Sequence, residues 1–420
     1  MANPNFIAKL AALPLPLRRA LETITALARK RTLDLYLVGG PVRDLLLGSP
    51  SLDLDLTVEG DGPALAREAA ASLGARCLEH PPFLTAALRL DGYIIDIATA
   101  RSETYEHPGA LPRVHPASIR EDLDRRDFTI NAMALPLTGP GRGRLLDPLN
   151  GRTDLAAGVI RVLHERSFIE DATRIIRAAR YEVRFGFRFE ERTEALLQRD
   201  VVYLETISGA RIREELSRIL SESEPERALL RLQALGAPPV IHPALDFDEA
   251  RVAARARLRE MEPEDPGLSA WALLGWGLSE GEAGAVAGRL ALTKAQSQAV
   301  CAMPALQGLE QALAAPDLAN SRLVETLSGR PAAAVWALAA ATDVPAVRER
   351  CLEYLRVLRR VKPALDGNAL ISLGVPEGPP VGEAMARLKA AKLDGEVRSR
   401  ADEERFVRSL LAKAGAKGAA

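Results

Sequence analysis

Short apolar runs separated by turn residues occupy the first part of the chain. Leu35–Val38 is such a run and predicts a strand. In Leu52–Val58, apolar and polar side chains alternate, which is the period-two pattern of a half-buried strand. Leu84–Leu90 and Tyr93–Thr99 flank the pair Asp91-Gly92, a combination typical of a tight β-hairpin. These runs predict a small sheet.

Helical spacing of apolar residues appears within this region and dominates after Gly151. Pro63–Leu73 predicts a helix with proline in its first turn. Phe168–Phe185 carries apolar residues at helical spacing and predicts one continuous helix, and Arg211–Leu220 and Glu224–Leu235 predict amphipathic helices. The chain is therefore expected to have an α+β fold, with a small mixed sheet near the N-terminus followed by helices.

The amino-acid composition indicates which class of protein this is, but says little about its activity. The 420 residues are 47% hydrophobic and 26% charged, which indicates a globular chain of two or three domains at about 150 residues each. The net charge of −1 neither favours nor excludes nucleic acid. Three scattered cysteines lack metal-ligand spacing and favour a reducing compartment. No apolar run approaches the roughly 18 residues of a membrane span. We therefore expect a cytoplasmic protein without a membrane partner.

Three acidic residues in predicted strands are candidates for metal chemistry. Asp53 and Asp55 alternate along one strand, so both carboxylates are expected on the same face, where they can share a divalent cation. Asp96 lies within an apolar strand, and we expect it to be buried and to need a partner or a metal. Gly40 and Arg43 precede these acids at a predicted helix start, where backbone N–H groups can approach a phosphate. An isolated acid pair or glycine turn is more often structural, but together they favour metal-assisted phosphoryl transfer.

Several motifs taken together resemble one known family. They look like those of class II tRNA nucleotidyltransferases, members of the DNA polymerase β superfamily that build the 3′ CCA end of tRNA; bacterial poly(A) polymerases share the same head. The matching segments are Leu35–Asp44 (LYLVGGPVRD), Asp53–Asp55 (DLD), Arg125–Ala134 (RRDFTINAMA), Asp147–Leu155 (DPLNGRTDL) and Glu170–Arg174 (EDATR). The resemblance covers roughly residues 33 to 220.

The resemblance implies particular residues for catalysis and for nucleotide binding. Asp53 and Asp55 match the family's metal-binding pair, for which Mg²⁺ is the expected cofactor, and Asp96 matches a third carboxylate of the superfamily. Three positions match contacts to the nucleoside triphosphate: Gly40, Arg43 and Arg126. The neighbouring Asp127 and Asn131 match positions near the sugar, although Asp127 also fits a helix N-cap.

Asp171 and Arg174 match the pair with which this family selects the base. At i and i+3 of a helix they would share a face, where a carboxylate accepts from the amino group of C or A and a guanidinium donates to the adjacent ring nitrogen. Without the resemblance, an exposed salt bridge is the simpler interpretation. Arg177 and Arg180 continue this face and match positions that hold the template and the triphosphate. The alternative interpretation of Arg177 and Arg180 is a basic helix face exposed to solvent.

The resemblance also implies a domain order. We expect a catalytic nucleotidyltransferase head at 1–145, a helical neck with the base-selecting helix at 146–215, a helical body at 216–345 and a tRNA-binding tail at 346–420. The segment Arg101–Asp122 contains Pro108-Gly109 and Pro112, and we expect a mobile loop there. In this family such a loop accompanies addition of A.

The resulting hypothesis is an enzyme that transfers CMP and AMP from CTP and ATP to the 3′ end of tRNA. Alternatives within the family are addition of A only, addition of the two C residues only, or poly(A) polymerisation. From other classes, a non-catalytic tRNA-binding protein and a small-molecule nucleotidyltransferase are also considered. The sequence does not specify the oligomeric state.

Overall fold

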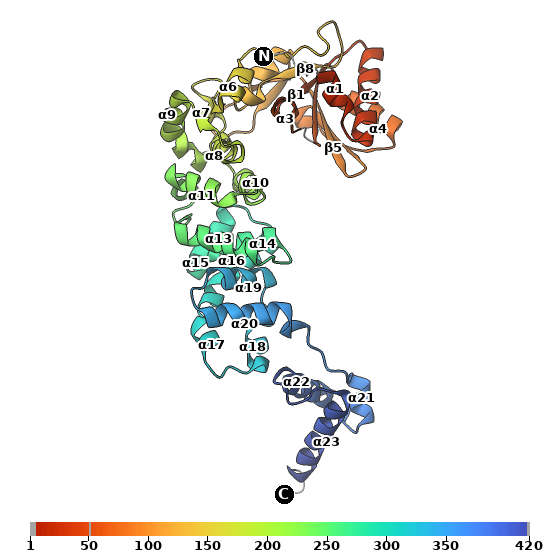
Figure 1. Cartoon of the computed structure of the whole chain (residues 1–420), viewed down its shortest axis with the longest axis vertical. Helices are drawn as coiled ribbons and strands as arrows, with labels where there is room; N and C mark the ends of the chain where they lie inside the picture. Colours follow the sequence, from red (N-terminus) through yellow and green to blue (C-terminus); the bar gives the residue numbers. More distant parts are fainter. Residues whose placement is uncertain (1–5, 50–51, 418–420) are drawn as a thin grey trace. The chain divides into compact units, whose positions relative to one another are not determined.

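The chain forms two compact units, Met1–Ile241 and His242–Ala420, each of which is described by itself. The computed structural model describes residues 6–49 and 52–417 (Figure 1). All strands of the described residues lie in the first unit, and the second unit is helical there, so the predicted α+β class is confirmed. The finer division into head, neck, body and tail stays a prediction, and its outermost residues, 1–5 and 418–420, lie outside the described residues.

The first unit contains a six-stranded mixed sheet in the order β3-β4-β5-β2-β1-β8. Its strands are β1 (Asp34–Val38), β2 (Leu54–Glu59), β3 (Arg76–His80), β4 (Thr85–Leu90), β5 (Tyr93–Thr99) and β8 (Ala134–Pro136). Only β2 and β5 pair in parallel; the other neighbours are antiparallel. The predicted hairpin is confirmed, because Asp91 (φ 49°) and Gly92 (φ 82°) both adopt the left-handed conformation that a type I′ turn requires.

Helices cover one face of this sheet. Helix α4 (Gly62–Leu73) packs on β4 and β5 and against α2 (Leu15–Lys30), and Figure 1 shows both helices on the same side of the strands. As predicted, α4 begins with proline in its first turn, and the side chain of Asp61 caps it by accepting from the N–H of Ala64 at 2.9 Å. Helix α3 (Gly40–Leu47) starts directly after β1. A short helix, α1 (Phe6–Ala11), precedes α2.

The segment that was expected to be a mobile loop contains regular structure. Strands β6 (Arg101–Thr104) and β7 (Arg113–Pro116) pair antiparallel, and α5 (Ile119–Asp124) follows them. Helix α5 begins with a capping box in which the side chains of Ser118 and Glu121 each accept from the other residue's backbone N–H. The irregular part of this hairpin is limited to the connection between its two strands.

After the sheet, the first unit continues as packed helices. These are α6 (Gly151–Ala157), α7 (Ser167–Glu170), α8 (Thr173–Phe185), α9 (Glu191–Asp200), α10 (Gly209–Leu220), α11 (Pro225–Ala234) and α12 (Ala237–Ile241), with a two-stranded pair β9 (Val159–Ile160) and β10 (Arg188–Phe189). The prediction of one helix over Phe168–Phe185 is wrong. Asp171 adopts an extended conformation (φ −142°, ψ 93°) between α7 and α8, and its side chain accepts from the N–H of Thr173 at 3.0 Å. Short polar side chains compete with the helix in this way.

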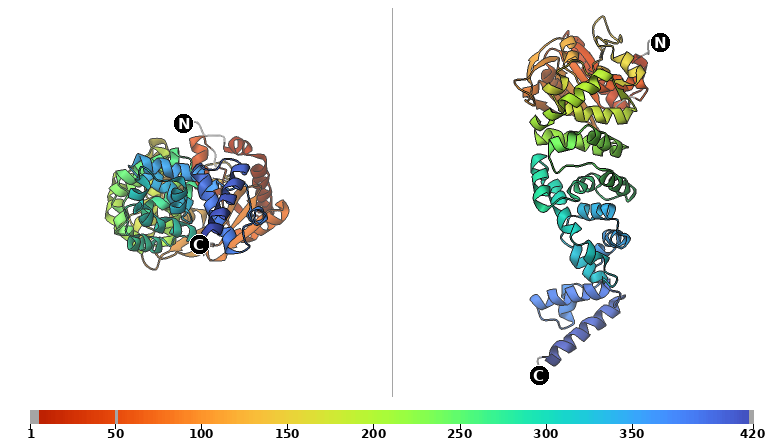
Figure 2. Two further views of the ribbon diagram at one scale, coloured as in Figure 1. Left: turned by 90° about the horizontal axis from the view of Figure 1, so that it is seen from below. Right: turned by 90° about the vertical axis from the view of Figure 1, so that its left-hand side faces the viewer.

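The second unit is an assembly of helices around a strongly apolar one. Its helices are α13 (Glu249–Glu260), α14 (Pro266–Ala272), α15 (Glu280–Arg289), α16 (Lys294–Gln307), α17 (Glu310–Ala314), α18 (Asn320–Leu327), α19 (Ala332–Ala341), α20 (Pro345–Arg356), α21 (Gly367–Ser372), α22 (Pro379–Leu393) and α23 (Arg400–Lys417). Helix α19 is apolar on every side, and α13, α14, α16 and α20 pack around it. Two further views of the ribbon show the helices of this unit in green to blue (Figure 2).

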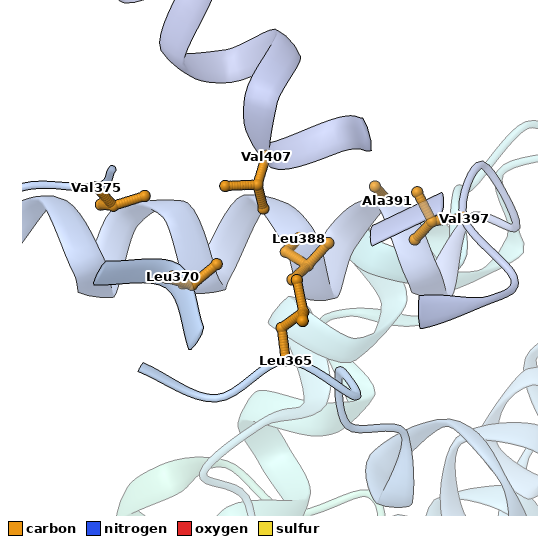
Figure 3. Packing of buried hydrophobic residues seen from close by; sticks show 7 residues of the cluster. All are labelled: Leu365, Leu370, Val375, Leu388, Ala391, Val397 and Val407. Carbon is orange, nitrogen blue, oxygen red and sulfur yellow. The ribbon is translucent and has the colours of Figure 1, made fainter. Parts of the chain in front are cut away.

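Helices α21 to α23 have their own apolar cluster, made of Leu365, Leu370, Val375, Leu388, Ala391, Val397 and Val407 (Figure 3). The carboxylate of Glu403 lies beside this cluster and accepts from the N–H groups of Ala364 and Leu365 and from the ammonium of Lys392. Among the described residues, no helix combines the length and the apolar character needed to cross a bilayer.

Candidate functional site

A cavity of about 400 Å³ in the first unit gathers residues from β2, α3, the β6–β7 hairpin, α8 and α10. Seven of the ten predicted site residues line it: Gly40, Arg43, Asp55, Arg126, Asp171, Arg174 and Arg177. The other three, Asp53, Asp96 and Arg180, are not among its lining residues. Segments more than a hundred residues apart in sequence therefore form one polar chamber.

The turn between β1 and α3 leaves no room for a side chain. Gly39 has φ 68°, and a Cβ atom there would lie 2.6 Å from Nη1 of Arg126. A left-handed conformation together with this close approach explains the glycine. The turn brings the first residues of α3 to the cavity wall, next to the Arg126 guanidinium. The N–H groups at this helix start and the charge of Arg126 together suit an anion.

Arg43 is buried and held on several sides. Its Nη1 donates to Oδ1 of Asn131 at 2.6 Å, and its Nε donates to Oδ1 of Asp44 at 2.8 Å. The guanidinium also lies over the ring of Phe185, with the carbon Cζ 4.6 Å from the ring centroid. Only 4% of the residue is exposed. Its charge is therefore fixed at the cavity wall before any ligand arrives.

Asp127 links the head to α8 through an ion pair whose carboxylate is buried. Its Oδ2 lies 2.6 Å from Nη2 of Arg177, and its Oδ1 accepts from the N–H of Phe128 and from the amide of Asn131. Burial alone would raise the pKa of this carboxyl, but Arg177 and the Asn131 hydrogen bond hold the pKa below its usual value. Asp127 therefore anchors Arg177 and is not a helix cap.

Asp122 anchors both arginines of the Arg-Arg-Asp motif. Its carboxylate, which is completely buried, lies 2.7 Å from Nη2 of Arg125 and 2.9 Å from Nη2 of Arg126. Burial opposes ionisation, yet the two guanidinium groups hold the pKa of Asp122 below its usual value. Arg125 also pairs with Glu103 of the β6 strand at 2.6 Å, so the hairpin and the motif are connected.

The three candidate acids lie on two neighbouring strands at the centre of the sheet. Asp55 and Asp96 are register partners in the parallel pair β2–β5, and Asp53 directly precedes β2. The expectation that Asp96 is buried is wrong. In β5 the alternate residues Ile95 and Ile97 face the core under α4, so Asp96 points to the opposite face of the sheet and is exposed.

The charges around Asp55 fit a cation. The pKa of Asp55 is raised to about 6, chiefly by burial; the positive charge of Arg126 lowers it, and the negative charges of Asp96 and Asp53 raise it. No group of three or more His, Cys, Asp or Glu side chains in the described ranges could hold a metal ion. Magnesium in proteins is commonly bound by one or two carboxylates together with substrate phosphates, so Asp55 on the cavity wall, with Asp53 directly before its strand, suits it.

Asp171 and Arg174 both reach the cavity, but not as an ion pair on one helix face. Oδ1 of Asp171 accepts from Oγ1 of Thr173 at 2.6 Å and from Nη2 of Arg211 at 2.7 Å. Arg174 is buried, and its Nη1 donates to Oγ of Ser167 at 2.7 Å. Its Nη2 donates to the carbonyl of Arg125 at 2.8 Å. Each side chain is thus held separately, and both line the same chamber.

Arg180 faces away from this chamber. Its Nη1 donates to Glu222 at 3.2 Å, and its Nη2 lies 3.8 Å from a carboxylate oxygen of Glu215 on α10. It also stacks over Tyr181, with Cζ 4.7 Å from the ring centroid. These contacts join α8 to α10, so Arg180 braces the helix that carries Arg174 and Arg177.

Sequence reasoning missed several residues that line the cavity, chiefly Tyr105, Arg125, Tyr181 and Arg211. Arg125 stands in a quoted motif and Tyr181 lies four residues after Arg177, so local patterns could have indicated both. Arg211 is forty residues from the carboxylate it contacts, and no local pattern relates them. Burial raises the pKa of Tyr105, and the neighbouring Glu103 raises it further, so the phenol stays protonated.

Comparisons with known families agree with this geometry. A model described as the poly A polymerase head domain matches residues 35–161, and one described as a probable RNA and SrmB-binding site of polymerase A matches residues 186–248. The first match contains Gly40, Asp55 and Arg126 of the cavity wall, whereas Asp171 and Arg174 fall between the two matches.

Curated relatives align along most of the chain. It is 32% identical over 401 residues to an A-adding tRNA nucleotidyltransferase of Halalkalibacterium halodurans, covering 93% of this chain and 92% of the relative. It is 36% identical over 379 residues to a CC-adding tRNA nucleotidyltransferase of Deinococcus radiodurans, covering 89% and 88%. An A-adding enzyme of Geobacter sulfurreducens is 34% identical, and there the chain covers 94% of its own length but only 47% of the relative's.

Solved structures match both units. A CCA-adding enzyme in an apo form has a TM-score of 0.78 at 30% identity, with 97% of this chain and 98% of that one covered. The Thermotoga maritima CCA-adding enzyme complexed with tRNA has a TM-score of 0.74 at 29% identity, with 97% and 99% covered. Complexes of a CCA-adding enzyme with ATP and with CTP match at TM-scores of 0.76 and 0.75.

Proposed function

Because this chain belongs to the tRNA nucleotidyltransferase family, we propose that it transfers both CMP and AMP, from CTP and ATP, to the 3′ end of tRNA. The reaction builds or repairs the CCA terminus and releases pyrophosphate. A tRNA substrate makes the cytoplasm the expected site of action.

One observation carries the proposal. The same cavity is lined by Gly40 of the glycine turn, by Asp55 and by Asp171, which supports a phosphate site, a metal-binding acid and a base-reading side chain next to one another. An enzyme acting on small molecules through phosphoryl transfer needs only the first two. A protein that merely holds tRNA needs neither the acid nor the base-reading pair.

Apart from Asp171 and Arg174, the residues divide into three tasks in this proposal. Arg43 and Arg126 bind the triphosphate, and Gly40 lets the backbone approach it. Asp53 and Asp55 would hold Mg²⁺, which when bound lowers the pKa of the attacking hydroxyl and offsets the charge of the triphosphate. Asp96 supplies a third negative charge across from Asp55. Arg177 and Arg180 keep α8 in place, through Asp127 and through α10 respectively.

Base selection in this proposal depends on hydrogen-bond polarity. The Asp171 carboxylate only accepts hydrogen bonds, so it fits the amino group of C or A. The Arg174 guanidinium has five N–H donors, and its bonds to Ser167 and Arg125 leave others for a ring nitrogen. U and G present a carbonyl at the position of the amino group, so an acceptor on the protein rejects them.

Addition of A alone is the second candidate. Two of the relatives described above are A-adding enzymes, and this chain retains the β6–β7 hairpin that the family associates with A addition. The two candidates differ only in whether CTP is a substrate.

Three tRNA substrates distinguish these functions: one that ends before CCA, one that ends after the first C and one that ends after CC. Each is incubated with CTP, with ATP and with both, and the products are sequenced. The proposal predicts completion of CCA on all three. Extension of the CC-ended tRNA alone identifies an A-adding enzyme, and a stop after CC identifies a CC-adding one. Long A tails on unrelated RNA indicate poly(A) polymerase, and no incorporation leaves a non-catalytic tRNA-binding protein.

A further inference from the structure

The carboxylate assigned to base selection is held by a residue from a different helix. Oδ1 of Asp171 accepts three hydrogen bonds, two from Thr173 and one from Nη2 of Arg211 on α10 at 2.7 Å. No hydrogen bond to Oδ2 joins it to another residue in the part of the chain that the structure describes. One oxygen of the carboxylate is therefore saturated by protein donors, and the other is left to accept a hydrogen bond from a ligand in the cavity that Asp171 lines.

Thr173 alone does not fix this side chain. Asp171 lies in the extended link between α7 and α8, so no regular helix restrains its backbone there. Both donors of Thr173 belong to one residue, two positions along the chain from Asp171. Arg211 approaches from α10 and is the only charged side chain with a described hydrogen bond to Asp171. A charge-assisted bond of this kind is shorter and stronger than a neutral one.

Arg211 is itself held in place by the β6–β7 hairpin. Its Nη1 donates to the carbonyl of Gly109 at 3.4 Å. Gly109 is pressed against the 3₁₀ helix η3 (Val201–Thr206): a Cβ atom at Gly109 would lie 2.4 Å from the carbonyl oxygen of Thr206, and its φ of 78° also favours glycine. The connection between β6 and β7 therefore contacts the guanidinium of Arg211, which in turn binds the carboxylate of Asp171.

We propose that Arg211 is a positioning residue for base selection, which keeps Oδ2 of Asp171 directed at the amino group of the incoming nucleotide. This inference rests on the proposed function. Without Arg211, the carboxylate rotates between orientations and no longer presents one acceptor. CTP and ATP then lose the advantage given by the amino group at C4 of cytosine or C6 of adenine, while metal binding at Asp53 and Asp55 is untouched. We therefore expect the loss of Arg211 to change the ratios of kcat/KM between nucleotides more than it lowers kcat/KM for all of them together.

The test measures kcat/KM for CTP, ATP, UTP and GTP with the full chain, on tRNA lacking CCA and on CC-ended tRNA. Arg211→Ala is expected to lower the ratios of CTP to UTP and of ATP to GTP by about 10-fold, the effect of one lost charge-assisted hydrogen bond. Arg211→Lys retains a charge and a donor, and is expected to keep most of the discrimination. Arg227→Ala is the matched control, because Arg227 makes an exposed ion pair with Glu224 on the next helix.

The outcomes separate this inference from the proposed function. If the unaltered protein incorporates no nucleotide, or incorporates all four equally, the proposed function fails. If it discriminates and Arg211→Ala discriminates equally well, or slows all four nucleotides by one factor, the positioning role is wrong. Should Arg211→Ala fail to fold, Arg211→Lys and Arg211→Met are compared instead, and a lower ratio in the Met variant alone supports the inference.

Discussion

Exchanging the Asp171 carboxylate for an amide changes one atom of the candidate base-reading site. Oδ1 already accepts from Thr173 and Arg211, and an amide oxygen can keep those bonds. In Asp171→Asn the amide NH₂ group therefore takes the place of Oδ2 and points into the cavity. A donor then faces the amino group of C or A, and the same donor fits the carbonyl of U or G.

The expected magnitude follows from one hydrogen bond. Losing a bond to a charged group costs about 1.5–3 kcal/mol, which corresponds to roughly 10- to 150-fold in kcat/KM for CTP and ATP. The change in folding stability is expected to be below about 1 kcal/mol, because the pair of Asp171 with Arg211 is partly exposed.

The assay compares kcat/KM for four nucleoside triphosphates on tRNA lacking CCA and on CC-ended tRNA, for the unaltered chain and for Asp171→Asn. We expect CTP and ATP to become poorer substrates while UTP or GTP is gained. Asp124→Asn, an exposed change on α5, is the matched control. If Asp171→Asn slows every nucleotide by the same factor, base selection resides elsewhere.

Three further predictions concern other parts of the site. Asp55→Ala should abolish incorporation of both nucleotides while circular dichroism and tRNA affinity stay nearly unchanged; normal turnover at saturating Mg²⁺ would refute the metal assignment. Deleting Glu103–Pro116 should impair A addition far more than C addition, and equal loss of both would count against a specific role of the hairpin. Asp127→Asn should lower the free energy of unfolding in urea by about 1.5–3 kcal/mol at pH 7, because the partly buried Arg177 loses its counter-charge and a charge-assisted hydrogen bond. Since the pKa of Asp127 is held below its unfolded value of about 3.9, this difference should shrink as the pH falls below about 4; a difference that does not change with pH would contradict the ion-pair account.

Local patterns were sufficient for much of the fold. The Asp91-Gly92 pair specifies its own turn, because both residues adopt positive φ. The alternation of apolar and polar residues in β2 reflects a strand with one buried face. The motif around Gly39 also depends on local geometry. These features are determined by residues a few positions apart, so the sequence alone could predict them.

Three features could not be predicted in this way. The break at Asp171 interrupts a segment whose apolar spacing is helical on both sides, and the competing bonds of one aspartate decide it. The contact between Asp171 and Arg211 depends on how α8 and α10 pack, which no short-range pattern encodes. The exposure of Asp96 likewise depends on which face of the sheet the helices cover.

Nucleotide binding in the absence of tRNA tests the central claim most directly, namely that one cavity both holds the triphosphate and reads its base. Equilibrium dissociation constants of CTP, ATP, UTP and GTP are measured by calorimetry on the full chain with Mg²⁺. The account predicts that CTP and ATP bind about 10-fold or more tightly than UTP and GTP, because C and A carry an amino group at the ring position that faces Asp171, where U and G carry a carbonyl. Equal affinity for all four nucleotides would contradict it.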